Sequence, residues 1–246
     1  MKRNDLVLGG MTPLSTLDFP GRLSAVLYAQ GCPLRCRYCH NPELWPMRAT
    51  PPQTSAPRTW TEAVAWLHRR RGLLDGVVFS GGEATAQPAL ADAVMQVRAL
   101  GFQTALHTAG IYPKRLEQIL PMLDWVGLDI KAPFDRYADV TGVPGSGDKA
   151  RNSLAAALSS GVEYELRTTV HSHLLTADDL LDIAKTLQSY GVRRWALQEF
   201  RTQGCCDAEL SKMPSALDPA LISRLREWVP EIAYRSSNVG SVWSLL

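Results

Sequence analysis

The feature that most restricts the fold is a regular alternation of apolar β-type runs with amphipathic helical stretches. Helices are expected between the runs because Leu90, Val94 and Val97 recur on one face, and because Thr59 and Thr176 are typical N-terminal caps. Such alternation predicts an α/β fold with parallel strands, either a doubly wound sheet or a full or partial (β/α) barrel. Six runs have the length and composition of buried strands: residues 23–30, 76–83, 102–108, 125–131, 164–171 and 193–200.

Other local signals place the remaining helices and one loop. Helices are expected to begin at Pro113 and at Pro219, the second extending to Trp228. A further helix is expected around Leu154, and the preceding segment "TGVPGSGD", residues 141–148, predicts a loop because of its glycine and proline content.

Polar and metal-binding residue types follow the predicted strands. Because the carboxyl ends of parallel strands meet at one edge, the functional face is expected there. The segments concerned are the cysteine-containing stretch after residue 30, "SGGE" (80–83), "HTAG" (107–110), "DIK" (129–131) and "LQEF" (197–200).

Length and composition are those of one globular domain. The 246 residues are 46% hydrophobic and 20% charged, which argues against disorder and coiled coils. We expect a single domain over residues 1–246, with a Pro-rich, irregular and mobile insert at about 41–58.

Charge and hydropathy exclude several partner classes. A net charge of +2 gives no broad attraction to nucleic acid, and the basic run at residues 69–71 is best explained as the solvated end of a helix. No run approaches the roughly 20 apolar residues that a membrane span needs, and the N-terminus has no signal-peptide pattern. The sequence therefore predicts a cytoplasmic protein that binds neither nucleic acid nor membranes.

Three of the five cysteines, Cys32, Cys36 and Cys39, fall within eight positions. Thiolates are soft ligands that suit zinc, copper(I) and iron–sulfur clusters. A structural zinc site normally has four ligands, and the nearest fourth candidate, His40, directly follows Cys39 and is poorly placed to complete the tetrahedron. A four-iron cluster held by three cysteines leaves one iron open for chemistry.

The other two cysteines, Cys205 and Cys206, are adjacent in sequence. They could form a vicinal disulfide, have a redox role or simply be packed, and two thiols are too few for a second cluster. We assign them no site.

The spacing of the cluster, three residues and then two, with Tyr38 before the last cysteine, resembles the signature of the radical S-adenosylmethionine (SAM) superfamily. The resemblance implies a partial (β/α)6 barrel with the cluster loop after the first strand, which selects the barrel over the doubly wound sheet. It also implies a [4Fe-4S] cluster on Cys32, Cys36 and Cys39, with SAM bound at the open iron.

The same resemblance assigns cofactor roles to residues along the predicted edge. Gly81 and Gly82 would let the backbone approach the cofactor without a Cβ in the way. Glu83 would accept a hydrogen bond from the ammonium of SAM, Tyr38 would lie near the adenine, and His107 is grouped with the cofactor-binding residues.

Asp129 and Lys131 lie on the same side of a strand because side chains alternate with a period of two. They resemble the Asp-x-Lys element that lies beside the cofactor in glycyl-radical-enzyme activases, although a buried ion pair is the simpler alternative. Arg167 would either pair with the cofactor's carboxylate or bridge the barrel interior. His171 and His173 are interpreted as ordinary residues at a strand end.

The resemblance extends upstream, because "STLDFPGRLSAVLYAQGCPLRCRYCHNPELW", residues 15–45, is similar to the opening of activating enzymes of glycyl radical proteins. The similarity is greatest to the activators of anaerobic ribonucleoside-triphosphate reductase. Asp18 corresponds to an activase position near the target loop of the partner, or else is a turn residue before Pro20. The stretch "LQEFRTQGCC" lacks the histidine often found there in formate-lyase activases, and Gln198 is the candidate substitute.

The implied reaction is reductive cleavage of SAM, which yields a 5′-deoxyadenosyl radical that takes a hydrogen atom from a glycine of the partner. The implied partners are a glycyl radical enzyme and an electron donor such as flavodoxin or ferredoxin. Three alternatives stay open: an activase of a pyruvate formate-lyase-like enzyme, a radical SAM enzyme acting on a small molecule or nucleoside, and a noncatalytic zinc-binding module.

Overall fold

The structure, a computed structural model, describes residues 5–47, 59–205, 207–213 and 216–236. The chain divides into two compact units. The first consists of Met1–Pro33, Glu43–Gly127 and Asn152–Tyr164, and the second of Leu34–Pro42, Leu128–Arg151 and Glu165–Leu246. Most of the Pro-rich insert, residues 48–58, lies outside the described residues.

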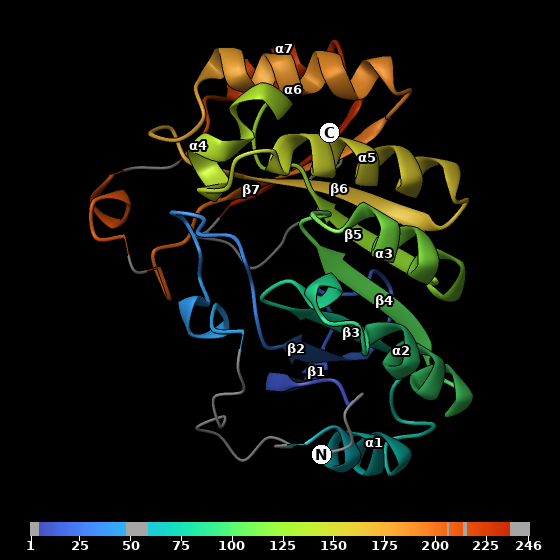
Figure 1. The fold of residues 1–246 in the computed structure, drawn as a ribbon. Coiled ribbons are helices and arrows are strands. Elements are labelled where there is room, and N and C mark those ends of the chain that lie inside the picture. Colours follow the sequence, from blue (N-terminus) through green and yellow to red (C-terminus); the bar gives the residue numbers. More distant parts are fainter. Residues whose placement is uncertain (1–4, 48–58, 206, 214–215, 237–246) are drawn as a thin grey trace. The chain divides into compact units, whose positions relative to one another are not determined.

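The first unit contains four neighbouring strands in chain order (Figure 1). β1 runs antiparallel to β2, whereas β2, β3 and β4 are parallel, with Val26 opposite Val78 and Val78 opposite Ala105. Both faces of β2 and β3 are largely buried, as expected of parallel strands. The strands are β1 (Leu8–Ser15), β2 (Ser24–Ala29), β3 (Gly76–Gly81) and β4 (Gln103–Thr108).

The helices of this unit start where the sequence predicts. The Thr59 side chain caps α1 by accepting a hydrogen bond from the Glu62 N–H, and Pro113 is the first residue of α3. Residues 69–71 follow α1 and are exposed, which agrees with their interpretation as a solvated helix end. The elements are α1 (Trp60–His68), α2 (Leu90–Ala99), α3 (Pro113–Ile119) and the short 3₁₀ turns η2 (Ala84–Ala86) and η3 (Leu120–Met122).

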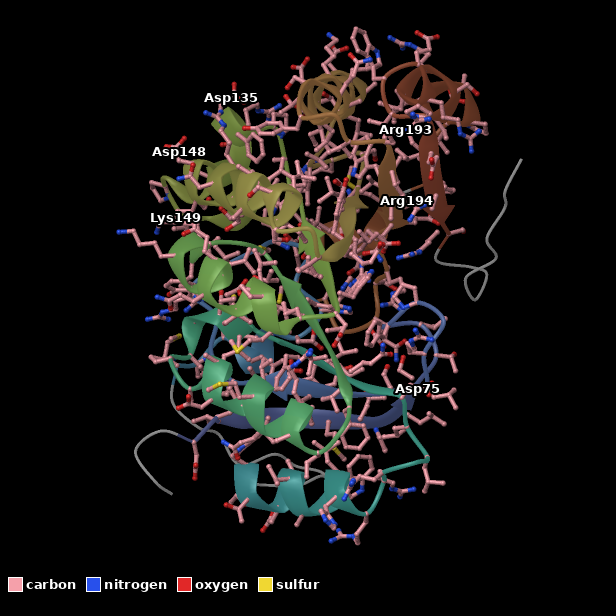
Figure 2. The ribbon with its side chains drawn as sticks, turned by 90° about the vertical axis from the view of Figure 1, so that its right-hand side faces the viewer. Asp75, Asp135, Asp148, Lys149, Arg193 and Arg194 are labelled. Carbon is pink, nitrogen blue, oxygen red and sulfur yellow. The ribbon has the colours of Figure 1, made fainter. Side chains whose placement is uncertain are left out.

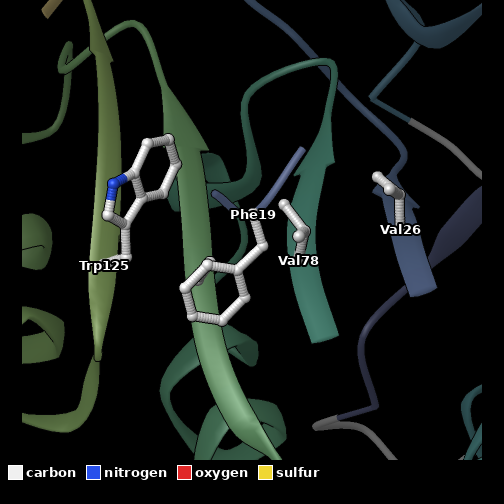
Figure 3. Close-up of a cluster of buried hydrophobic side chains, with 5 residues drawn as sticks. Phe19, Val26, Val78 and Trp125 are labelled. Atoms are coloured by element: carbon white, nitrogen blue, oxygen red, sulfur yellow. The ribbon is translucent and has the colours of Figure 1, made fainter. Parts of the chain in front are cut away.

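One cluster of buried side chains joins the parallel strands of the first unit to the segment between β1 and β2. Phe19, from that segment, packs with Val26, Val78 and Ala105 and tilts against the Trp125 ring at 6.2 Å between centroids (Figure 3). The segment before β2 is therefore fixed by burial of its aromatic residue, which holds the neighbouring Asp18 in a defined position.

β5 (Trp125–Asp129) and α5 (Ser146–Ser159) each have residues in both units. Just before β5, the Asp124 N–H donates to the Thr104 carbonyl, and just after it the Ile130 N–H donates to the Arg167 carbonyl.

The second unit contains β6 (Glu163–Val170), β7 (Arg194–Glu199) and β8 (Glu231–Arg235), which are parallel neighbours (Figure 1). A capping box between Thr176 and Asp179 begins α6 (Ala177–Ser189), and Asp218 caps α7 (Pro219–Arg226). α7 lies against α6 and β8. The remaining elements are α4 (Tyr137–Thr141), η4 (Phe134–Arg136), η5 (Leu210–Lys212) and η1 (Pro42–Leu44), whose residues are divided between the two units.

The six predicted strands are confirmed. The sequence prediction misses the first and last strands of the sheet and misplaces boundaries of two helices. β1 and β8 were not expected, because the Gly-Gly-Met-Thr-Pro part of β1 has low β propensity and β8 is short. The predicted loop at 141–148 is wrong in part, since Gly142 ends α4 with a positive φ and α5 begins at Ser146. Trp228 lies just beyond α7 rather than within it.

Charged side chains are mostly on the outside of each unit. Those labelled in Figure 2 are all exposed: Asp75, Asp135, Asp148, Lys149, Arg193 and Arg194. Among the residues that the structure describes, no helix combines the length and apolar character that crossing a membrane requires.

Candidate functional site

A few charged side chains are exceptions to this outward distribution. Burying a charged side chain is unfavourable unless the charge is paired. A buried charge therefore either has a partner in the protein or marks a candidate functional position. The buried charged residues among those described are Glu83, Lys131, Glu165, Arg167 and Asp179. Three of them, Glu83, Lys131 and Arg167, are residues that the sequence assigns to a cofactor site.

Glu83 lies in the first unit, directly after β3, and is 1% exposed. Its Oε1 accepts from the Thr85 N–H, the Thr85 hydroxyl and the Thr108 hydroxyl, and its Oε2 accepts from the Ala109 N–H at 2.8 Å. The strand ends of β3 and β4 thus hold the carboxylate in one orientation. Oε1 is saturated by three donors, whereas Oε2 has one further acceptor position, which is the one suited to an incoming ammonium.

Replacing Glu83 with glutamine is expected to lower the free energy of unfolding by about 1–3 kcal/mol, because one amide N–H₂ must then face a protein donor. Urea denaturation of the apo-protein measures this. Glu117→Gln, at an exposed position of α3, is the matched control and is expected to change little. Equal stability of both variants would contradict the hydrogen-bond network described for Glu83.

Gly81 and Gly82 are required by the chain's own backbone. A Cβ on Gly81, where φ is +121°, would lie 2.3 Å from the Ala29 nitrogen, and a Cβ on Gly82 would lie 2.5 Å from the Gly31 oxygen. The structure therefore shows why glycine is required at both positions, which the sequence prediction did not anticipate. A residue without a Cβ lets the end of β3 lie close to the segment that leads to Cys32. Their contact with a cofactor stays a prediction.

The segment containing Cys32 is closed at its base by backbone and amide hydrogen bonds. The Gly31 N–H donates to the Leu44 carbonyl and the Cys32 N–H to the Trp45 carbonyl. The buried Gln30 side chain donates to the carbonyls of residues 43 and 46. Sequence reasoning missed Gln30, although a polar residue at the end of a buried strand directly before the cysteines was a usable signal.

His107 and Asp18 are brought together in the first unit. The His107 Nε2–H donates to the Asp18 carbonyl at 2.8 Å, its Nδ1 lies 4.0 Å from the Asp18 carboxylate, and its ring meets Trp125 edge-on. The Asp18 carboxylate also accepts from the Ser15 hydroxyl. A predicted cofactor residue and a predicted partner residue therefore share one hydrogen-bonded arrangement.

Cys36 and Cys39 belong to the second unit, and the Cys39 N–H donates to the Cys36 carbonyl across a tight turn. Both are free thiols. Burial raises the pKa of Cys36, and the positive charge of Lys131 offsets this only in part. A nearby ammonium favours the thiolate that metal binding requires.

Asp129 and Lys131 form the ion pair that their spacing predicts, with 2.9 Å between Nζ and Oδ2. Burial, the largest influence, lowers the pKa of Lys131, but Asp129, Tyr38 and Cys36 together outweigh burial and raise the pKa well above its usual value. Lys131 Nζ also lies 5.4 Å from the centre of the Tyr38 ring. Tyr137, which the sequence did not single out, donates to the Asp129 carbonyl and accepts from the Lys131 N–H, so it fixes this strand end.

Arg167 pairs with protein rather than standing alone. Its Nε donates to Glu165 at 2.8 Å, and Arg235 of β8 binds both oxygens of the same carboxylate at 3.0 and 2.8 Å. Arg167 therefore belongs to an ion-pair network with Glu165 and Arg235 in the second unit, and its expected roles toward a cofactor or across the barrel interior stay predictions. Glu165 could have been found from sequence, because it lies two residues before Arg167 on the same strand face.

Glu165 is expected to make stability depend on pH. Burial, the largest influence, raises its pKa, but Arg167 and Arg235 together outweigh burial, and the pKa lies below its ordinary value of 4.5. The stabilisation is therefore present above pH 4.5 and is lost as the pH falls through the lowered folded pKa. In urea denaturation, the stability difference between wild type and Glu165→Gln should shrink as the pH falls below 4.5. Glu163→Gln, exposed on the same strand, should show no such convergence.

The remaining candidates lie in the second unit. His171 follows β6, where its Nε2–H donates to the Leu210 carbonyl and its Nδ1 accepts from the His173 N–H, which agrees with their interpretation as strand-end residues. Gln198 is half-buried in β7, opposite Thr169. The Cys205 thiol donates to the Arg37 carbonyl, and Cys206 lies outside the described residues.

The donor set fits an iron–sulfur cluster by its chemistry. The three thiols at short spacing are soft ligands, and one of them, Cys36, lies near the buried ammonium of Lys131. Within the described ranges, no three His, Cys, Asp or Glu side chains are grouped closely enough to bind a single metal ion. A four-iron cluster binds each thiolate through a different iron, so it does not require such a group.

Comparison with known proteins gives consistent matches. The family model described as the radical SAM superfamily matches residues 26–190. A protein of Methanocaldococcus jannaschii, provisionally named a glycyl-radical enzyme activating enzyme, is 28% identical over 231 residues, which is 85% of each chain. The pyruvate formate-lyase-activating enzyme of Streptococcus mutans is 31% identical over 206 residues, covering 77% of this chain and 75% of that protein.

Other matches are partial or concern the fold. The chain spans about half (54%) of the pyruvate formate-lyase-activating enzyme of Clostridium pasteurianum, at 38% identity. Among solved structures, QueE from Escherichia coli aligns over 94% of both chains with a TM-score of 0.55 and 14% identity. At this identity the similarity concerns the fold, and it supports the barrel-type α/β architecture expected for the sequence.

Proposed function

Since the chain belongs to the radical SAM superfamily and is a glycyl-radical enzyme activase similar to the pyruvate formate-lyase activases, we propose that it activates an anaerobic ribonucleoside-triphosphate reductase. The observation that carries this choice of partner is the similarity of residues 15–45 to the opening of the reductase activators. Within that stretch, Asp18 is held by His107 and Ser15, which would keep it in place for a partner loop.

In this proposal Cys32, Cys36 and Cys39 hold a [4Fe-4S] cluster and leave one iron to SAM. When bound, such a cluster would supply one electron to SAM, so that the bond between sulfur and the 5′ carbon breaks and methionine leaves. The 5′-deoxyadenosyl radical would then take a hydrogen atom from the partner's glycine. The support from the structure is the compatible donor set and the Lys131 charge near Cys36.

The chain's own residues would bind and orient SAM. Glu83 Oε2 has the acceptor position for the SAM ammonium, and its other hydrogen bonds would prevent the carboxylate from turning away. Asp129 and Lys131 are kept at a fixed strand end by Tyr137, and Tyr38 lies beside Lys131. Gly81, Gly82, His107 and Arg167 complete the proposed cofactor-binding set.

A second candidate partner is a pyruvate formate-lyase-like enzyme. The observation in its favour is that several relatives, including the 31% identical protein of Streptococcus mutans, carry the name of that activase. The lack of a histidine in "LQEFRTQGCC" is the observation against it.

The test is anaerobic reconstitution followed by electron paramagnetic resonance with each purified partner and a donor such as flavodoxin or ferredoxin. We expect about four irons per chain, SAM cleavage with dithionite, and a glycyl radical doublet with the reductase. A doublet with the formate-lyase alone would select the second candidate.

Two other outcomes would reject activation of any glycyl radical enzyme, not only the choice of partner. SAM cleavage without a doublet on either partner would indicate a radical enzyme acting on a small molecule or nucleoside. A colourless protein that retains one zinc would indicate the noncatalytic module.

A further inference from the structure

We propose that the loop after β7, residues 201–210, positions Cys36 and Cys39, and that Asp207 is the positioning residue at its centre. All contacts described here lie within the second unit, and residue 206 is outside the described residues. The inference rests on the proposed function, because it takes Cys36 and Cys39 to be cluster ligands.

The first contact is an ion pair between the loop and the residue after Cys36. Arg37 Nε lies 2.9 Å from Asp207 Oδ2, and the Asp207 side chain is 19% exposed. The other oxygen of Asp207 accepts from the N–H groups of Glu209 and Leu210. The carboxylate of Asp207 is therefore oriented by hydrogen bonds from its own loop, independently of Arg37. It can thus restrict the position of Arg37 and of the turn that carries Cys36 and Cys39.

The second contact brings the two backbones together. The Cys205 thiol donates to the Arg37 carbonyl at 3.4 Å. Gly204, at a φ of +86°, lies so close to His40 that a Cβ would be 2.4 Å from the His40 oxygen. Only glycine permits this approach, and the loop therefore lies directly against the turn that carries both cysteines.

The third contact holds the residue after Cys39. His40 Nε2–H donates to the Arg201 carbonyl at 2.8 Å, and its ring stacks on Phe200 at 5.6 Å. Phe200 in turn meets His171 edge-on, and His171 binds the Leu210 carbonyl. One end of the loop thus continues from Phe200, directly after β7, and the other end is bound at Leu210 by His171, directly after β6.

These contacts give roles to residues that sequence analysis left without one. Arg37 follows Cys36 and His40 follows Cys39, so the loop contacts the turn at the residue directly after each proposed ligand. Cys205 acts as a hydrogen-bond donor to the turn rather than as a ligand.

The test measures alkylation of each cysteine in the full-length apo-protein, resolved by peptide mass spectrometry. Asp207→Asn weakens the ion pair, and we expect alkylation of Cys36 and Cys39 to accelerate roughly two- to fivefold. Cys32 is the internal control, because it is as buried as Cys36 (both 7% exposed) but is held in the first unit. Asp139→Asn, which removes an exposed carboxylate paired with Arg136, is the matched control variant.

A second pair of variants keeps the test valid if Asp207→Asn disturbs the loop's own hydrogen bonds. Arg37→Gln should reproduce the acceleration, and Arg37→Lys should restore slow alkylation because it keeps the cation. Unchanged rates at Cys36 and Cys39, or an equal increase at Cys32, would overturn the inference.

Reconstituted protein provides an independent measurement. Iron should leave Asp207→Asn and Arg37→Gln faster than wild type under a chelator, with the same initial iron content. If wild type takes up no iron, the proposed function fails, whereas the alkylation pattern of the apo-protein still decides whether the loop controls the turn.

Discussion

Replacing Cys36 with alanine is expected to reduce bound iron from about four per chain to near zero and to abolish deoxyadenosine formation from SAM. Each of the three thiolates binds a separate iron in the proposed centre, so two remaining thiols leave a second iron without a protein ligand. Iron analysis and chromatography of the reaction products measure the two effects. Cys36 also lies near the buried Lys131, which would keep its ion pair with Asp129 in this variant.

The matched control is Cys205→Ser, which removes a thiol outside the three-cysteine motif but keeps a hydrogen-bond donor toward the Arg37 carbonyl. This variant should retain its iron content. Full iron content and deoxyadenosine production in Cys36→Ala would refute the proposed centre and with it the assignment of Cys32 and Cys39.

Replacing Gly81 with alanine is expected to destabilise the first unit by more than about 4 kcal/mol, or to prevent folding. The new Cβ would lie 2.3 Å from the nitrogen and 2.4 Å from the oxygen of Ala29, both of which are backbone atoms of β2. These atoms cannot rotate away as a flexible side chain could, so β2 and β3 would have to separate. Urea denaturation, or the yield of folded protein, measures the effect.

Gly101→Ala separates the two causes that act at Gly81. Gly101 also has a positive φ, of +92°, but nothing lies within 4 Å of its ideal Cβ. This control should therefore lose only about 1 kcal/mol, the cost of the left-handed conformation. Similar stability of the two variants would show that close packing at Gly81 is not what requires glycine.

Much of the fold could be predicted because its signals are local. The apolar runs that became β2 to β7, the Thr59 and Thr176 caps and the glycine after α2 depend on neighbouring residues only. β1 and β8 gave weaker local signals, because the Gly-Gly-Met-Thr-Pro part of β1 has low β propensity and only Ile232 is buried in β8.

The candidate site divides along the same line. The spacing of the three cysteines is given by the sequence, and Asp129 and Lys131 are paired as expected of residues two apart, although β5 ends at Asp129 and Lys131 lies just beyond it. The partners of Glu83, Glu165 and Gln30 do not follow from sequence, because Thr108, Arg235 and the Pro46 carbonyl are not their neighbours in the chain.

The sequence by itself determined the type of fold, the thiolate donor set and the superfamily, since all three depend on residue identity and short spacing. Only the tertiary structure showed that Gly81 is needed for strand approach, that Arg235 of β8 binds Glu165 of β6, and that the loop after β7 lies on the cysteine turn. These features depend on burial, because a buried polar group needs a hydrogen-bond partner and a buried Cβ needs space. Which groups surround a buried residue depends on the segments that the fold brings together.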